Sequence, residues 1–460
     1  MSAEEPSALA APAAGARDSH TESPRGTAVG SYFVANYPPF SFWGKDLVGE
    51  ARAALERPGD PATPLGLYLH IPFCRKRCKF CYFRVYVDKN AQEVEEYLDA
   101  LAREVEILAD RPAVRGRSLC YVYFGGGTPS YLSAAQLGRL VERVRTALPW
   151  DHADEITFEA EPGTLSRKKL EEIRRIGVTR LSFGVENFDD RILEENGRAH
   201  RSAEIFRSWR DAREAGFPQI NLDLIAGMVG ETDENWHRCI ERTIELKPDS
   251  VTIYQMELPF NTVFSKQLLE AGGSGTAPVL VAGWEEKRRW VGEAFEALER
   301  RGYRIGSGYT ALRDDPGRPA RFVYRDALWH GADLLGTGVA SFSYAGGVHF
   351  QNADRLEDYI ARLEGGDLPI ARALPTRPVE RLVREMILQL KLGAIDAGYF
   401  RRKFGAEILR DFAPAFEGLR ARGLLSWEGD RIALSRAALL QVDDLLPDFY
   451  LPEHRGARYT

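Results

Sequence analysis

Three of the five cysteines lie within eight residues, in the stretch HIPFCRKRCKFCYF, and they are the first candidates for chemistry. Cys74, Cys78 and Cys81 have the spacing C-x3-C-x2-C, and the basic residues between them are expected to lower the pKa of the thiols. A structural zinc ion would need a fourth Cys or His at matched spacing, and none stands nearby. Three thiolates leave one iron of a [4Fe–4S] cluster open to a chelating substrate. We therefore expect an iron–sulfur cluster, with zinc as the alternative.

The composition is that of a globular protein, in which hydrophobic residues make up 44% of the 460 residues and charged residues 28%. The formal net charge of -6 gives no basic excess that would indicate a nucleic-acid or anionic-membrane partner. No apolar run approaches the roughly 20 residues that span a bilayer, and no signal pattern begins the chain, so a cytoplasmic protein is expected. Cys120 and Cys239 stand alone and are interpreted as small buried hydrophobic residues.

The elements that must position the cysteines alternate between short β-branched or aromatic runs and longer segments with helical periodicity. Six such units in succession predict a parallel sheet with right-handed crossovers, closed into a partial (β/α)6 barrel with a smaller, mainly helical C-terminal domain. The predicted strands are LGLYLHI, CYVYFGG, EITFEAE, TRLSFGVE, INLDLIAG and SVTIYQME, and the clearest helices are residues 91–109, 133–148, 235–247 and 284–302.

The chain divides into five predicted regions. Residues 1–30 are rich in Ala, Pro, Ser and Gly and are expected to be a disordered tail. Residues 31–64 form a lead-in whose aromatic stretch, SYFVANYPPFSFW, should pack on the body or cover a site. The barrel occupies residues 65–280, an extension with a substrate region follows at 281–370, and residues 371–460 form a winged-helix-like domain with a hairpin at GLLSWEGDRIALS.

Six motifs occur in a fixed order: LYLHIPFCRKRCKFCYF, VYFGGGTPSYL, FEAEPGTL, RLSFGVENFDDRIL, NLDLIAGM and YQMELP. Over roughly residues 60–450 the sequence resembles the oxygen-independent coproporphyrinogen III oxidase family of radical S-adenosylmethionine (SAM) proteins. The resemblance implies a [4Fe–4S] cluster whose open iron is chelated by SAM, and reductive cleavage of SAM to methionine and a 5'-deoxyadenosyl radical. It also implies a small-molecule substrate of the tetrapyrrole class and an electron donor such as flavodoxin or ferredoxin.

Site residues follow from the resemblance, position by position. Cys74, Cys78 and Cys81 would be the cluster ligands. The glycines of GGGTP would let the backbone approach the methionine part of SAM closely. Several carboxylates stand near the carboxyl ends of successive predicted strands, where barrel active sites assemble. The implied SAM-binding residues are Tyr68, Phe80, Gly125, Gly126, Gly127, Thr128, Glu159, Glu186, Arg198 and Asp223.

The resemblance also implies positions for a second SAM. These positions are Ile253, Met256, Tyr324 and Phe342. Apart from the resemblance, the cationic side chains of Arg321, Arg325 and His330 could meet substrate carboxylates or lie on a solvated surface, and the aromatic residues around them would suit a flat apolar substrate or a core.

Three activities remain open within the family. The first is oxidative decarboxylation of porphyrinogen propionates, which the aromatic lead-in favours, although Phe83 and Glu186 replace a Cys and a Gln that are common among the oxidases. The second is radical C-methylation or cyclopropanation with two SAM molecules. The third is haem trafficking by a chaperone, whose His-Asn-x-x-Tyr-Trp element is replaced here by residues 324–329, YRDALW, without the His.

Overall fold

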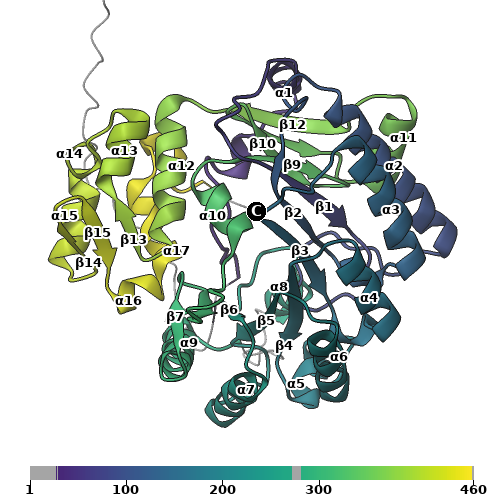
Figure 1. Ribbon diagram of the computed structural model, residues 1–460. Helices are drawn as coiled ribbons and strands as arrows, with labels where there is room; N and C mark the ends of the chain where they lie inside the picture. The colour runs from purple at the N-terminus through teal and green to yellow at the C-terminus, as the bar shows by residue number, and fades with distance from the viewer. Residues whose placement is uncertain (1–26, 28, 272–280, 458–460) are drawn as a thin grey trace, which may run out of the picture.

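The computed structural model describes residue 27, residues 29–271 and residues 281–457, so most of the predicted tail lies outside the described residues. Six parallel strands curve into one sheet in chain order, which confirms the predicted partial (β/α)6 barrel (Figure 1). Each predicted strand is present to within two residues of its expected ends. The strands are β1 (Leu65–Ile71), β2 (Leu119–Gly126), β3 (Glu155–Ala160), β4 (Arg180–Glu186), β5 (Gln219–Ala226) and β6 (Ser250–Gln255).

Helices cover the outer face of the curved sheet (Figure 1). Their starts are set by polar side chains that accept from free backbone amides, as Asn90 does for α2 and Ser133 for α3 in capping boxes. The apolar stripes of these helices and the outward side chains of the strands form one continuous core. The helices of the barrel are α2 (Ala91–Ala109), α3 (Ala134–Ala147), α4 (Arg167–Arg175), α5 (Asp190–Glu195), α6 (Ser202–Glu214), α7 (Asp233–Leu246) and α9 (Trp284–Glu299).

The sheet extends beyond the six parallel strands at both edges, which the sequence pattern did not predict in full. Two strands extend the sheet beyond β6, and the one paired with β6 runs antiparallel to it. Four strands extend the sheet beyond β1, and the one paired with β1 runs parallel to it. The last of them crosses the boundary predicted at residue 371, so the large sheet reaches slightly into the region expected to be C-terminal. The added strands are β7 (Tyr303–Ile305), β8 (Thr310–Arg313), β9 (Asp333–Thr337), β10 (Phe342–Ala345), β11 (Val348–Asn352) and β12 (Ile370–Pro375).

The N-terminal segment runs along the open side of the barrel. Gly30 N donates to Leu258 O at 2.8 Å, and Gly44 exchanges backbone hydrogen bonds with Ala373 on β12. Helix α1 (Val48–Leu55) then packs on β11 and β12. The aromatic lead-in therefore packs on the body of the protein and links both sides of the barrel opening.

The remaining chain forms a second core around helix α12 (Pro378–Leu390). A three-stranded antiparallel sheet completes it, and its hairpin of β14 (Leu425–Glu428) and β15 (Arg431–Leu434) lies where the sequence predicted one. Val34 and Tyr37 from the N-terminal segment are buried in this core, so that segment connects the two parts. Across the described chain, no helix combines the length and apolar character needed to cross a membrane.

Candidate active site

The three clustered cysteines lie on the loop that follows β1, beside the loop that follows β2. Cys74 N donates to Tyr86 O at 3.0 Å, and Cys81 N donates to Cys78 O at 3.2 Å, which folds the loop back on itself. The Thr128 hydroxyl donates to Cys74 Sγ at 3.3 Å. A Cβ built on Gly127 would lie only 3.0 Å from Cys74 Sγ, so the glycine keeps the second loop close to the thiol.

The three thiols are not arranged as ligands of a single zinc ion. The ligands of one tetrahedral zinc lie about 4 Å from one another, whereas three cluster thiolates bind three different irons and lie farther apart. Among the residues that the structure describes, no three Cys, His, Asp or Glu side chains converge as ligands of one ion. His70 does not belong to such a group of described side chains, and its Nδ1 lies 3.3 Å from the Tyr68 hydroxyl.

Two of the thiols have raised pKa values, whereas the basic residues between the cysteines predicted lowered ones. Burial raises the pKa of Cys74 to about 12 and that of Cys81 to about 11. The basic residues of the loop do not prevent this, because Arg75 is directed to Glu161 and Arg77 to backbone carbonyls of Cys81 and Asn261. Metal binding to these thiols therefore has to displace their protons.

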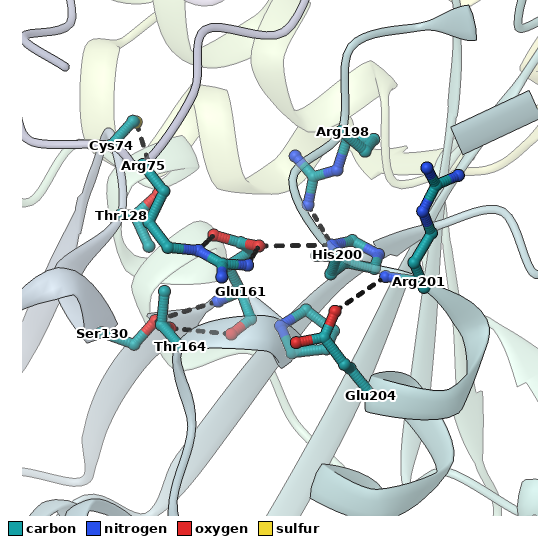
Figure 2. Close-up of polar contacts among 12 residues, drawn as sticks. Cys74, Arg75, Thr128, Ser130, Glu161, Thr164, Arg198, His200, Arg201 and Glu204 are labelled. Carbon is teal, nitrogen blue, oxygen red and sulfur yellow. Dashed lines mark hydrogen bonds and ion pairs between the residues drawn. The ribbon is translucent and has the colours of Figure 1, made fainter. Parts of the chain in front are cut away.

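A buried carboxylate ties this loop to the next strands (Figure 2). Glu161 Oε1 accepts from Arg75 Nη2 at 2.6 Å and lies 3.6 Å from His200 Nδ1. Its backbone is held by Ser130, whose hydroxyl accepts from Glu161 N at 3.0 Å, and by the Thr164 hydroxyl, which donates to Glu161 O at 2.8 Å. Burial would raise the pKa of Glu161, but the His200 and Arg75 side chains lower it to about 2.

Next to the cysteines a cavity of about 450 Å³ enters the barrel. Alternate residues of β4 line it, namely Arg180, Ser182, Gly184 and Glu186, as expected for a strand with one face turned to the interior. Six residues separate the first and the last, which corresponds to about 20 Å along the strand. The cavity therefore extends from the cysteine loop deep into the barrel.

Three of the predicted carboxylates meet in this cavity. Glu159 accepts from the Tyr123 hydroxyl at 2.7 Å and from Gly126 N at 3.2 Å. Burial raises the pKa of Glu159 and of Glu186 to about 7 each, and it also raises the pKa of Asp223. The cavity therefore carries less negative charge at neutral pH than its composition indicates.

Glu186 adopts a backbone conformation that is rare for a residue with a side chain. Its φ is +64°, at a register shift between β4 and β5. This conformation places the Glu186 carboxylate 3.7 Å from Arg198 Nη2. Arg198 also donates to Cys78 Sγ at 3.3 Å and to Gly184 O at 2.6 Å, so it connects the cysteine loop with the end of β4.

Most of the predicted SAM residues come together at the cavity. Phe80, Gly126, Gly127 and Thr128 line it with the three cysteines, with Arg198 and with the three carboxylates. Within the described chain, Tyr68 and Gly125 do not line the cavity: Tyr68 stacks on Tyr123 with ring centroids 5.8 Å apart.

The predicted second-SAM residues do not form one site. Met256 lines the cavity, but Ile253 is buried in the core behind the sheet, because the side chains of β6 alternate and its neighbours Thr252 and Tyr254 face the interior. Tyr324 packs against Tyr123, with ring centroids 4.4 Å apart. Phe342 is exposed and contacts Phe40 and Trp43 instead.

The three cations predicted to meet substrate carboxylates also lie elsewhere. Arg325 is buried against Asp326, with Nη2 2.7 Å from the carboxylate. His330 Nδ1 contacts Asp326 O, and the Arg321 backbone is hydrogen-bonded to Gln219. Sequence reasoning missed Arg180, a buried cation that does line the cavity, because it stands at the amino end of a strand.

Aromatic side chains from distant segments complete the wall. Phe33 of the N-terminal segment packs edge-on against Tyr309 at 5.0 Å and Tyr254 at 6.3 Å. Phe322 lines the cavity beside them. No local pattern marks these residues, although the aromatic lead-in indicated that its rings would cover something.

Comparison with known proteins identifies the family to which the chain belongs. The protein-family model for the radical SAM superfamily matches residues 68–243 of this chain. The chain is 31% identical to the oxygen-independent coproporphyrinogen III oxidase of Escherichia coli (strain K12) over 72% of each chain. It belongs to this radical SAM family. Another relative is the heme chaperone HemW of Bacillus subtilis (strain 168), with 30% identity over 83% of this chain and 98% of that protein.

A solved structure agrees with this membership. The coproporphyrinogen III oxidase HemN of Escherichia coli, a radical SAM enzyme, matches 91% of this chain and 96% of its own with a TM-score of 0.78 and 26% identity. The radical SAM family uses a [4Fe–4S] cluster and SAM. In this member of the family, the cavity offers three thiols beside carboxylates and a guanidinium, which is a donor set that fits both groups.

Proposed function

We propose that this radical SAM protein is an enzyme that decarboxylates porphyrinogen propionates oxidatively. The observation that carries the proposal is one cavity that begins at the three thiols and continues about 20 Å into an aromatic-walled barrel. Such a cavity suits a flat, mostly apolar ligand that bears carboxylates, placed directly beside the radical source. Membership in a family with named coproporphyrinogen oxidases supports the choice.

Some side chains would hold the cluster, and others would position SAM beside it. Cys74, Cys78 and Cys81 would hold the cluster, and Arg198 would pair with the SAM carboxylate as guanidinium groups do. Glu159 would accept from the ribose hydroxyls of SAM, and Phe80 would flank the adenine. When bound, the cluster and SAM supply a 5'-deoxyadenosyl radical, which can take a hydrogen atom from a carbon.

For a propionate side chain, loss of that hydrogen atom allows the carboxylate to leave as carbon dioxide and a vinyl group to form. The balance requires that one further electron passes to a one-electron acceptor. The N-terminal segment would exclude water from this chemistry, since Ser31, Tyr32 and Phe33 line the cavity.

Haem trafficking is the second candidate, because the HemW relative is matched along 98% of its length. The segment at residues 324–329 offers no His, and Tyr324 is packed against the barrel wall. Radical C-methylation with two SAM molecules is the third candidate.

The deciding experiment is an anaerobic assay of the reconstituted protein with SAM, a reductant and coproporphyrinogen III. We expect 5'-deoxyadenosine together with tetrapyrroles that have lost carbon dioxide, detected by mass. Deoxyadenosine without a change in the tetrapyrrole would refute the decarboxylase. S-adenosylhomocysteine would indicate methyl transfer, and tight haem binding without turnover of coproporphyrinogen would indicate the chaperone.

A further inference from the structure

Arg180 is a buried cation whose binding capacity is not used by the protein. It opens β4 and is only 2% exposed. Its guanidinium lies over the ring of Phe322, 4.0 Å from the centroid. Nε and Nη1 are buried and have no hydrogen-bond partner among the described residues. The residue nevertheless lines the cavity, so part of its side chain borders the space where a ligand would lie.

The neighbouring carboxylates do not pair with this cation. No ion pair within 4.0 Å joins Arg180 to an acid in the described part of the chain. Glu159 is engaged by Tyr123 and Gly126, and Asp223 by the Ser182 hydroxyl at 2.8 Å. Arg180 acts on both only through its charge, which lowers the pKa that burial raises.

Burial of an unpaired charge costs several kcal/mol, so such groups are normally paired or hydrated. While no ligand is bound, water in the cavity can hydrate only the part of the Arg180 guanidinium that borders the cavity, because Nε and Nη1 are shielded. A flat apolar ligand that fills the cavity expels this water, and the cation would then lose its hydration. A ligand that brings its own anion restores the pairing, and a guanidinium matches the two oxygens of a carboxylate.

We infer that Arg180 binds a carboxylate of the substrate at the inner end of the cavity. Arg180 and Glu186 lie at opposite ends of β4, so a carboxylate held by Arg180 is remote from the cysteine loop and is not the group that reacts. Arg180 thereby selects substrates with more than one carboxylate. This inference rests on the proposed function, because it places a carboxylated tetrapyrrole in this cavity.

The test measures equilibrium binding to the reconstituted protein with SAM present, in the dark and without reductant. The two probes are coproporphyrin III, with free propionates, and its tetramethyl ester. We expect the protein to prefer the free acid. Arg180→Gln should weaken binding of the acid about 10- to 100-fold and leave the ester unchanged, since a hydrogen bond to a charged group is involved. Arg180→Lys, which keeps the charge without the fork, should lie between.

Arg325→Gln is the matched control, because Arg325 is also buried and lies 5.6 Å from the same Phe322 ring but is paired with Asp326 away from the cavity. Thermal melting and iron content show whether each variant is folded. The inference is overturned if Arg180→Gln keeps wild-type affinity for the acid, if acid and ester weaken equally, or if the wild type does not prefer the acid. Selective binding by Arg180 without any decarboxylation would leave the inference standing and remove the proposed reaction.

Discussion

Replacing Glu161 with Gln tests whether a buried carboxylate holds the cysteine loop. The side chain is 8% exposed and accepts from Arg75, the residue next to Cys74. A pKa of about 2, against an ordinary 4.5, means that folding favours the ionised form by about 3 kcal/mol, at about 1.4 kcal/mol per pH unit. This stability is present above pH 4.5 and is lost as the pH falls toward 2. Because the His200 contact is long, at 3.6 Å, we take this value as an upper limit.

Two measurements follow from that magnitude. Thermal unfolding at pH 7.5 should shift down by at most about 6 to 12 °C, given roughly 2–4 °C per kcal/mol for a large domain. Because Arg75 is released beside a cluster ligand, the variant should also lose iron faster than the wild type when a chelator is added. The difference in melting temperature should be constant between pH 6 and 8, since Glu161 is ionised throughout that range.

Glu172→Gln is the matched control. Glu172 also accepts two hydrogen bonds from one arginine, Arg175, but that guanidinium is 66% exposed, and such surface pairs contribute less than about 1 kcal/mol. We expect little change in its melting temperature and none in its iron retention. Equal losses in both variants, or a Glu161→Gln difference that varies between pH 6 and 8, would refute the reasoning.

Three further predictions concern the site. Cys78→Ala should abolish the cluster absorbance and SAM cleavage after reconstitution, whereas Cys120→Ala should retain both; a Cys78 variant with normal iron content would contradict the ligand assignment. Burial raises the pKa of Glu159 to about 7, so its carboxylate is protonated below that pH, and cationic SAM should bind about tenfold more weakly at pH 6 than at pH 8. Glu159→Gln should reduce this pH dependence, and the remainder is expected from Glu186, whose pKa burial also raises to about 7; an unchanged slope in the SAM titration would exclude Glu159 as a cause. Lys287 Nζ donates to the Thr27 hydroxyl and to Met256 O, both at 2.7 Å. Lys287→Met should therefore speed proteolysis of the N-terminal segment, which mass spectrometry can follow. A variant that is cleaved at the wild-type rate would show that this contact does not hold the segment.

The local sequence was sufficient for the barrel and for the gathering of three cysteines on one loop. Strands of six to eight residues with regular helices between them have a strong hydrophobic period, and three cysteines at C-x3-C-x2-C spacing are close together in any fold. The short strands at the sheet edges escaped this reasoning because three to six residues carry little periodicity, and their pairing depends on the barrel already being formed.

The charge states and the interior of the cavity were decided only by tertiary structure. The basic residues beside Cys74 predicted a lowered thiol pKa. In the structure Arg75 pairs with Glu161 instead, and burial raises the pKa of the Cys74 thiol. The choice between Ile253 and Tyr254 as cavity residue depends on which face of β6 turns inward, a one-residue difference in register that the motif does not contain. Arg180 became a candidate for the same reason, because only the closed barrel shows that its guanidinium is buried, has unpartnered nitrogens and lies at the wall of the ligand space.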